Sequence, residues 1–221
     1  MLYSDEKKFI FVHIYKTGGE SVVAALRRYC PLYLSNRYVN KAIRTLPEPS
    51  RTLLGWRESL VRRQHMTAEQ IRNVMPRHLF EQSIRFAFVR NPWDWHVSMY
   101  SYATQTKEHP RHEEIVALKS FDNYIRYRCD EGVSLQSSFV FDSSGEKIVD
   151  HVGRFENLSA DFEKICSDLG IGAKLPHKNA SKRKKDWRTY YTDETYDLIR
   201  RAYDRDIMAF GYAETTPSRQ A

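Results

Sequence analysis

Residues 9–22 read Phe-Ile-Phe-Val-His-Ile-Tyr-Lys-Thr-Gly-Gly-Glu-Ser-Val, and this stretch decides the fold. Its first part, Phe9 to Ile14, is a short apolar run rich in aromatic and β-branched residues, which is typical of a strand buried on both faces. Residues 16–21 form a tight turn that contains two glycines. Apolar residues then recur at helical spacing before Pro31: Val22, Val23, Leu26 and Tyr29. The stretch therefore predicts a strand, a glycine turn and a helix, in that order.

The predicted turn has the chemistry of an anion-binding site. The N-terminus of a helix presents backbone N–H groups that lack intrahelical partners, and the helix dipole favours negative charge there. Lys16 adds a full positive charge at the end of the strand, and Thr17 and Ser21 add hydroxyl groups. The alternative is an ordinary connection whose glycines serve only the turn. Because lysine and hydroxyls flank the glycines, we expect the turn to bind a phosphate or sulfate group.

The turn differs from the nucleotide-triphosphate P-loop. That motif, G-x-x-x-x-G-K-[ST], places its lysine after the glycines and follows it with a hydroxyl that binds Mg²⁺. In this chain Lys16 precedes Gly18 and Gly19. The Walker A pattern is therefore absent from the turn.

The composition is that of a soluble globular protein, with 41% hydrophobic and 29% charged residues. A chain of 221 residues is most simply one domain, and we expect it to span residues 1–212, followed by a flexible tail at 213–221. The formal net charge of +7 fits a polyanionic ligand, but many proteins without such a ligand are equally basic.

The cysteines and the apolar runs indicate the cellular setting. The chain has three cysteines, Cys30, Cys129 and Cys166, and their odd number and wide separation argue against a disulfide framework or a zinc site. We expect no metal and a reducing, cytoplasmic setting. The N-terminus lacks the apolar core of a signal peptide, and no run approaches transmembrane length.

A second buried strand ends in another candidate anion site. Residues 84–89 read Ile-Arg-Phe-Ala-Phe-Val, and Arg90 follows them. Asn91 is a good N-cap and Pro92 a good first helical residue, so a helix is expected to start there. Arg90 and Ser98 would flank its N-terminus, as an anion site requires. The alternative is a strand-end arginine that pairs with Asp94, and the sequence leaves both open.

The remaining segments alternate between helices and strands. Thr67 and Gln70 form a capping box that starts a helix at Ala68, and a further strand ends near Arg154. Three further helices are expected: about 121–128, one capped by Asn157 and closed by Gly170, and one from Thr192 to Phe210. This order predicts an α/β fold with a mostly parallel central sheet covered by helices on both faces.

The two candidate anion sites together resemble a known family. Residues 14–21 are similar to the 5′-phosphosulfate loop of sulfotransferases that use 3′-phosphoadenosine 5′-phosphosulfate (PAPS), and residues 88–98 resemble their 3′-phosphate-binding strand and helix. The resemblance extends through residues 154–158 and 190–212, so it covers nearly the whole chain. It is closest to soluble bacterial relatives of the Golgi carbohydrate sulfotransferases, and it implies a three-layer P-loop-like fold.

The resemblance also implies the residues that bind the co-substrate. Lys16, Thr17, Gly18, Gly19, Glu20 and Ser21 would hold the 5′ end, and Arg90 with Ser98 the 3′ phosphate. Two positions depart from the family's pattern. Tyr15 stands where a proline is usual, and Trp95 stands where an arginine is common. The basic run at 182–185, with Lys182 and Arg183, would supply the missing phosphate contact.

The implied reaction moves a sulfuryl group from PAPS to a hydroxyl of an acceptor, with PAP as product and no metal. Lys16 would neutralise charge on the leaving oxygen. A histidine suits the base that removes the acceptor proton. His65 is our choice, because it lies two residues before a capped helix, where the neutral form is favoured, and related carbohydrate sulfotransferases place a catalytic histidine in this interval. Glu20 is the alternative base.

The acceptor is expected to be a carbohydrate or another alcohol, and the sequence leaves its identity and the oligomeric state open. Two other functions compete with this interpretation: a Mg²⁺-dependent P-loop nucleotide kinase, and a non-catalytic domain that binds nucleic acid through the basic run at 182–185 and its neighbouring aromatic residues. A sulfotransferase-like binder without activity is a third. We expect neither nucleic acid nor a membrane as a partner.

Overall fold

The computed structural model describes residues 1–30, 64–176 and 186–212. These residues form two compact units, each built from two segments of the chain. The first comprises Met1–Val89 and Ser138–Lys178, and the second Arg90–Ser137 and Asn179–Ala221. We describe each unit by itself. The predicted tail at 213–221 lies outside the described residues, and the single domain over 1–212 stays a prediction.

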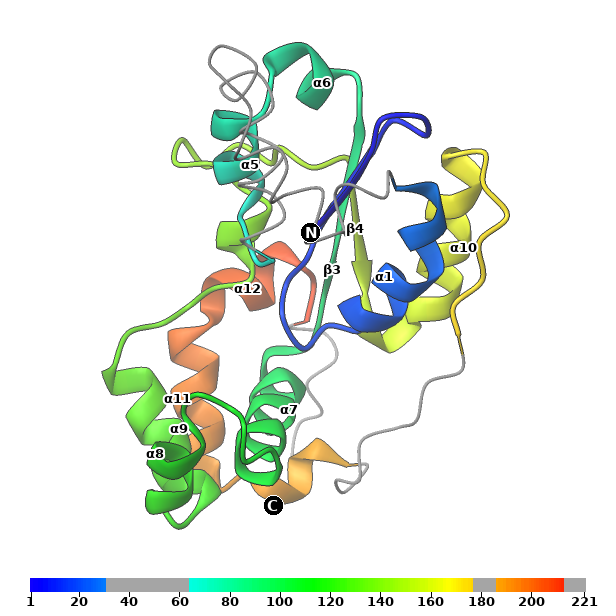
Figure 1. Ribbon diagram of the computed structural model, residues 1–221. Coiled ribbons are helices and arrows are strands. Elements are labelled where there is room, and N and C mark those ends of the chain that lie inside the picture. Colours follow the sequence, from blue (N-terminus) through cyan, green and yellow to red (C-terminus); the bar gives the residue numbers. More distant parts are fainter. Residues whose placement is uncertain (31–63, 177–185, 213–221) are drawn as a thin grey trace, which may run out of the picture. The chain divides into compact units, whose positions relative to one another are not determined.

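The first unit is built on a four-stranded sheet (Figure 1). The sheet has the order β1-β2-β3-β4, in which β1 runs antiparallel to β2 while β2, β3 and β4 run parallel. Phe11 lies opposite Phe86, and Ala87 opposite Val152. The strands are β1 Leu2–Ser4, β2 Phe9–Val12, β3 Ile84–Val89 and β4 His151–Arg154. The mostly parallel sheet predicted from the sequence is therefore confirmed, and β1 is an addition that the sequence did not predict.

The helices of the first unit follow the predicted strand–turn–helix order. The helix expected after the glycine turn is α1, and the capped helix before Pro76 is α5, whose capping box joins Thr67 and Gln70 in both directions. The helix that closes at Gly170 is α10. The helical elements are α1 Gly19–Leu26, η1 Arg27–Tyr29, α5 Ala68–Val74, α6 Arg77–Glu81, η3 Phe155–Asn157 and α10 Leu158–Asp168, with η2 Ser137–Phe139 where the units join along the chain.

The sheet has an apolar core on the face covered by α1 and α10. Alternate residues of β2 and β3 point to this face, and four of them are phenylalanines: Phe9, Phe11, Phe86 and Phe88. Val22 and Leu26 of α1 and Phe162 and Ile165 of α10 pack against these rings, all nearly or fully buried. Figure 1 shows the two helices side by side along the sheet, with α5 on the opposite side. This packing fixes where the turn between β2 and α1 lies.

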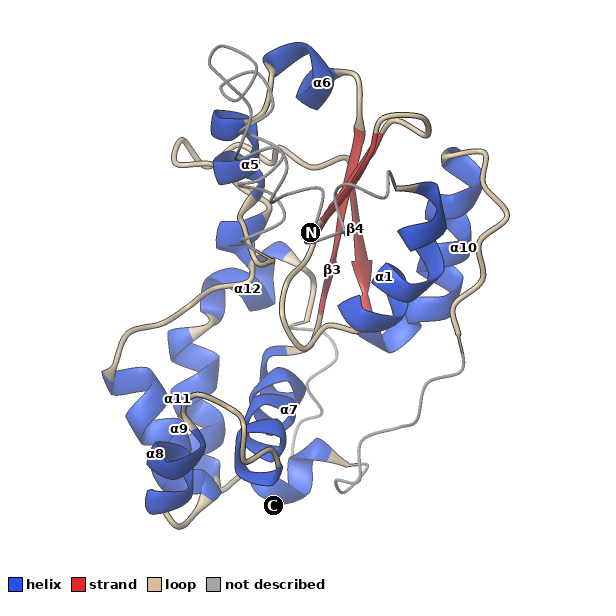
Figure 2. Ribbon diagram, in the orientation of Figure 1, coloured by secondary structure: helices blue, strands red, loops and turns tan. Residues whose placement is uncertain are grey.

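In the described residues of the second unit, helices are connected by loops, and no strand is present (Figure 2). Its elements are α7 Pro92–Gln105, α8 His112–Ala117, α9 Phe121–Asp130, η4 Trp187–Tyr190, α11 Asp193–Ala202 and α12 Asp204–Ala209. Aromatic rings form its core. The Trp93 ring stacks on Tyr196 at 4.8 Å and on Trp187 at 5.9 Å between ring centroids. The Tyr191 hydroxyl donates to the carbonyl oxygen of Trp93 at 2.8 Å.

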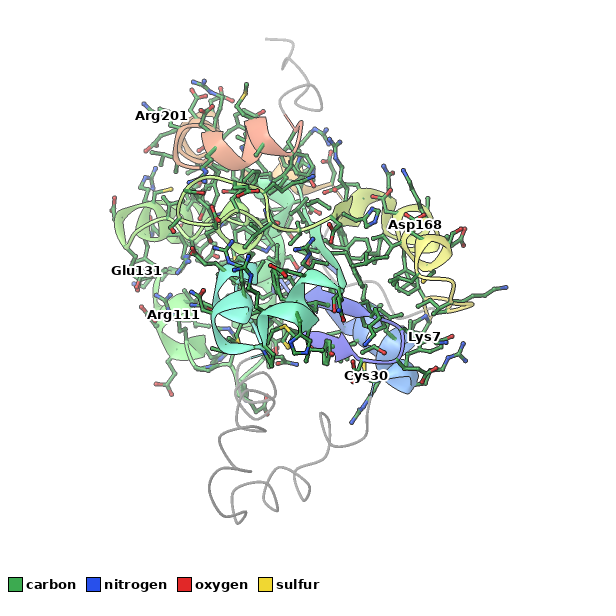
Figure 3. The ribbon with its side chains drawn as sticks, turned by 90° about the horizontal axis from the view of Figure 1, so that it is seen from above. Lys7, Cys30, Arg111, Glu131, Asp168 and Arg201 are labelled. Carbon is green, nitrogen blue, oxygen red and sulfur yellow. The ribbon has the colours of Figure 1, made fainter. Side chains whose placement is uncertain are left out.

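Two features of the second unit differ from the sequence prediction. The single helix expected from Thr192 to Phe210 is two helices, because Tyr203 leaves the helical conformation with φ −111° and ψ 19°. Helix α8 was not predicted. Arg111 stabilises its start by pairing with Glu114 at 2.7 Å and with Glu131, at the end of α9, at 2.7 Å (Figure 3). This pairing lowers the pKa of Glu114 to about 2.

Candidate active site

The turn between β2 and α1 contains two residues in the left-handed region. Lys16 has φ 62° and Gly18 has φ 84°. Thr17 lies between them, fully buried, and its hydroxyl donates to the carbonyl oxygen of Ile14 at 2.8 Å. This hydrogen bond ties the turn to the residues just before it. The side chain of Thr17 is therefore part of the turn's own structure, and only its backbone N–H would serve a ligand.

The N-terminus of α1 is arranged to accept an anion. Its N-cap is Gly18, which has no side-chain oxygen to satisfy the first-turn N–H groups. The Gly18 carbonyl oxygen accepts from the N–H groups of Ser21 and Val22, at 3.0 and 3.4 Å. The N–H groups of Gly19 and Glu20 precede the first intrahelical hydrogen bonds. Together with the half-buried Lys16, they make a set of donors suited to a phosphate or sulfate.

His13 lies directly behind this turn. A Cβ atom on Gly19 would overlap Nε2 of the His13 ring, so the ring packs against the first residue of α1. The ring also stacks on Phe11 at 5.5 Å between centroids and is 3% exposed. Burial, followed by the charge of the N-terminal ammonium group and of His65, lowers the pKa of His13 to about 3. His13 is therefore neutral over the physiological range and packs against the turn.

His65 is held against His13. Its Nδ1 lies 2.9 Å from the backbone carbonyl oxygen of His13, and the two rings are 4.7 Å apart. A carbonyl oxygen only accepts, so Nδ1 carries the hydrogen and, in the neutral ring, Nε2 is left as the proton acceptor. The ring of Tyr15 meets His65 edge-on at 5.7 Å. His13 thus contacts both the predicted base, His65, and the first residue of α1, Gly19.

In the second unit, Arg90 lies just before Asn91, the N-cap of α7. Asn91 caps this helix by accepting from the N–H groups of Trp93 and Asp94, at 3.1 and 3.3 Å, and Pro92 is the first helical residue, as predicted. Arg90 is 4% exposed, and its Nε and Nη2 atoms lie 2.7 and 2.6 Å from Oδ2 of Asp94. The ion pair that the sequence offered as an alternative is therefore present. Ser98, one turn further along α7, is also buried.

Comparison with known proteins decides the family. A model of the sulfotransferase family matches residues 1–213. The chain belongs to the sulfotransferase family. This confirms the resemblance seen in the two motifs, and with it the prediction that the protein is a sulfotransferase enzyme.

Two individual proteins are similar to this sulfotransferase. The mouse sulfotransferase SULT7A1, solved in complex with PAP, superposes with a TM-score of 0.55 at 14% sequence identity, covering 93% of this chain and 86% of the mouse chain. This likeness confirms the predicted α/β, P-loop-like fold. An uncharacterised protein of Archaeoglobus fulgidus is 29% identical over 121 residues, which are 50% of this chain and 87% of the archaeoglobal one.

The position that departs from the family's arginine is part of the core of this sulfotransferase. Trp95 is completely buried, and its ring meets His96 at 5.7 Å and Tyr203 at 6.2 Å. The neighbouring His96 is also completely buried, and burial, followed by the charge of Arg128, lowers its pKa to about 3. Trp95 is therefore a core residue of the second unit.

Three further predictions concern the basic run, a metal site and a membrane-spanning helix. Lys182 and Arg183 lie outside the described residues. Within residues 1–30, 64–176 and 186–212, no three His, Cys, Asp or Glu side chains gather as a metal site would require. In the same part of the chain, none of the helices combines the length and the apolar character needed to cross a bilayer.

Sequence reasoning missed one residue near the second motif and understated another near the first. His13 was expected to pack or hydrogen-bond near the turn, and its carbonyl group in addition sets the tautomer of His65. Gln136 was not considered, yet its side chain bonds to both backbone groups of Arg90. Neither contact has a local signal in the sequence, because each joins residues separated by more than 40 positions.

Proposed function

We propose that this sulfotransferase moves the sulfuryl group of PAPS to a hydroxyl oxygen of a carbohydrate or another alcohol and releases PAP. The observation that carries the proposal is the turn after β2, where the Lys16 side chain and the first backbone N–H groups of α1 supply donors and positive charge. A dianionic group is the ligand such a set accepts best. The mouse sulfotransferase with the same fold is complexed with PAP, which supports this nucleotide as the product here.

We propose that two groups of residues bind the nucleotide, one at its 5′ end and one at its 3′ phosphate. Lys16, the N–H groups of residues 17–20 and the Ser21 hydroxyl are proposed to bind the 5′ end, and Arg90 with Ser98 the 3′ phosphate. Asp94 would hold the Arg90 guanidinium in one orientation. Lys182 and Arg183 are proposed as further phosphate contacts. When bound, PAPS supplies a sulfuryl group joined to a phosphate that can leave.

Lys16 is proposed to act on the leaving group. As the acceptor oxygen bonds to sulfur, the bond between sulfur and the bridging phosphate oxygen breaks, and its electron pair stays on that oxygen. The Lys16 ammonium group and the first-turn N–H groups of α1 stabilise the resulting negative charge. These groups are in place before the reaction, so they need no reorganisation during it. We therefore propose catalysis that needs no metal ion.

His65 is proposed to take the acceptor's proton at Nε2. Its Nδ1 hydrogen is held by the His13 carbonyl group, which leaves Nε2 as the ring's acceptor in the neutral state. The ring is exposed at the protein surface, where an alcohol has access to it. Glu20, an exposed carboxylate in the first turn of α1, is kept as the alternative base.

The function is tested with labelled PAPS and a panel of hydroxyl acceptors. We expect transfer by the wild type and a loss of about 10²–10³-fold in Lys16→Ala, the usual effect of removing one such charge contact. Lys8→Ala is the matched control. Lys8 is in the same unit, also has positive φ, 49°, and pairs with Asp5 at 2.8 Å. Normal transfer by Lys16→Ala would overturn the role given to this residue.

The base is tested by two substitutions compared with each other. His65→Ala should lower turnover by roughly 10²–10⁴-fold, the range for general bases, while PAP binds as tightly as before, and added imidazole should restore part of the rate. Glu20→Gln should leave turnover near normal. His78→Ala, which removes an exposed histidine of the same unit, serves as the control. A collapse of PAP affinity in His65→Ala would assign His65 a structural role.

Ligand specificity separates this function from the rival ones. We expect PAP to bind in the presence of EDTA, whereas a kinase would bind ATP and only with Mg²⁺. A nucleic-acid-binding domain would instead bind oligonucleotides with steep salt dependence and would be indifferent to Lys16→Ala. The three cysteines are free, and we propose that the protein works in a reducing, cytoplasmic setting.

A further inference from the structure

The backbone of Arg90 is held by a side chain from a distant part of the chain. The Arg90 N–H donates to Oε1 of Gln136 at 2.9 Å, and Nε2 of Gln136 donates to the Arg90 carbonyl oxygen at 2.8 Å. Val89 is the last residue of β3 paired with β4, so Arg90 lies one residue beyond that ladder. The Gln136 amide thus pairs with Arg90 as a neighbouring strand would.

Gln136 is itself fixed by a buried carboxylate. Asp206, in the first turn of α12, accepts from the N–H of Gln136 at 2.7 Å and from the N–H of Ser137 at 2.9 Å. Gln136 and Asp206 are both completely buried. A buried carboxylate is costly unless donors satisfy it, and here two backbone groups do. The three residues form one connected chain of hydrogen bonds within the second unit.

We infer that Gln136 and Asp206 are positioning residues for the 3′-phosphate site. Arg90 contributes its guanidinium group to that site, and the side chain can only be aimed if its own backbone is fixed. Asp94 pairs with the Arg90 guanidinium group, and the Gln136 side chain hydrogen-bonds to the Arg90 backbone. Asp206 in turn accepts a hydrogen bond from the Gln136 N–H. The inference rests on the proposed function, and it adds two residues, neither of which is expected to touch the nucleotide.

The test compares PAP with adenosine 5′-monophosphate, which lacks the 3′ phosphate. The variant is Gln136→Met, which removes both hydrogen bonds at nearly constant volume. We expect PAP affinity to fall by about 10- to 100-fold, the range seen for partners that orient a binding group, and AMP affinity to stay unchanged. Gln105→Met, the same change at an exposed position of α7, should alter neither affinity.

Two further variants keep the test decisive if Gln136→Met does not fold. Gln136→Glu keeps the acceptor for the Arg90 N–H but loses the donor to the Arg90 carbonyl, and Asp206→Asn weakens the hold on residues 136 and 137. Each should lower PAP affinity while leaving AMP affinity unchanged. An equal loss for PAP and AMP, or no loss in any folded variant, would overturn the positioning role.

The same measurements distinguish the failure of this inference from the failure of the proposed function. If the wild type binds PAP no better than AMP, the 3′ phosphate has no site and the proposed function fails. If the wild type prefers PAP and the folded Gln136 and Asp206 variants keep that preference, only the positioning role is wrong.

Discussion

At the scale of single residues, contacts with neighbouring side chains hold the glycine turn, the candidate anion site, in its conformation. Lys16 adopts a left-handed backbone conformation that costs an L-residue about 1–2 kcal/mol. The bond from Thr17 to Ile14 and the packing of His13 against Gly19 hold the turn in this shape. The strain is therefore offset by ordinary packing and hydrogen bonding. The turn is set before any ligand arrives.

The substitution Gly19→Ala tests the packing of the His13 ring against the turn, because it adds a single methyl group at that contact. Alanine is normally the better helix former, by up to about 1 kcal/mol. Here its Cβ would overlap the His13 ring, which Phe11 and His65 flank on its other sides. We expect a lower melting temperature and at least tenfold weaker PAP binding, since one methyl group displaces the first residue of α1. Differential scanning fluorimetry and calorimetric titration measure the two effects.

Two companion variants control for the change to alanine. Gly172→Ala adds a methyl group where no atom lies within 4 Å, and it should leave both properties unchanged. Gly19→Ala combined with His13→Ala removes the overlap and should recover PAP binding in part. If Gly19→Ala alone binds PAP normally, the contact with His13 does not constrain the turn.

At the scale of the elements, α5 connects helix capping to the proposed base. Thr67 accepts from the Gln70 N–H at 3.1 Å, and the Gln70 side chain accepts from the Thr67 N–H at 3.0 Å. His65 stands two residues before this cap, and buried Met66 lies between them. The start of α5 therefore fixes the direction from which the His65 ring approaches His13.

Thr67→Ala should separate the stability of α5 from the action of His65. Loss of an N-cap typically costs about 1 kcal/mol, and fraying of the first turn should also loosen His65, so turnover should fall together with the melting temperature. Thr192→Ala is the matched control, because Thr192 caps α11 with the same type of box. It should lose similar stability and keep its kcat at saturating PAPS. Full kcat in Thr67→Ala would show that His65 is held independently of α5.

Local signals explain which elements the sequence could predict. The capping box of Thr67, the Asn91-Pro92 start and the glycine turn each act within a few residues, and each structure forms where expected. The missed elements depend on distant partners. Strand β1 has three residues, too few to show an alternating pattern, and it pairs with β2. The predicted last helix breaks at Tyr203, whose ring is buried against Trp95 and His96.

The same reasoning applies to the candidate site. Lys16 and Arg90 could be named from sequence because charge, glycine and helix start lie together in each motif. The hold of Gln136 on Arg90 could not, since it spans 46 positions and follows from the packing of the second unit. Supporting residues of this kind leave no pattern in a single sequence.

At the scale of the whole molecule, each unit contains one histidine that is neutral because it is buried. His13 in the first unit and His96 in the second both have a pKa lowered to about 3, with burial as the leading cause. Within the described part of the chain, neither ring nitrogen of His96 has a hydrogen-bond partner. An unfolded chain would protonate both residues near pH 6.5. Between about pH 3 and pH 6.5, His13 and His96 are therefore neutral in the folded protein and protonated in the unfolded chain.

Because the two buried histidines stay neutral in the folded protein, we expect the free energy of unfolding to fall in acid. Between pH 6.5 and about 3 the unfolded state binds more protons, so the free energy of unfolding rises with pH and falls as the solution is acidified. The expected slope is about 1.4 kcal/mol per pH unit for each of the two histidines. His96→Phe keeps an aromatic ring in place and removes the unpaired nitrogens. It should raise stability at pH 7 by about 1 kcal/mol and cut the slope by about half.

Urea unfolding at a series of pH values from 7 to 4 measures both quantities. His78→Phe, at an exposed position of α6, should leave the slope unchanged. Carboxylates whose pKa is lowered in the folded state, Glu114 and Asp142 among them, add to the acid sensitivity at lower pH in every variant alike, because their stabilisation is lost only as they protonate. The difference between His96→Phe and the wild type isolates the buried ring. An unchanged slope in His96→Phe would mean that His96 becomes protonated in the folded protein as readily as in the unfolded chain.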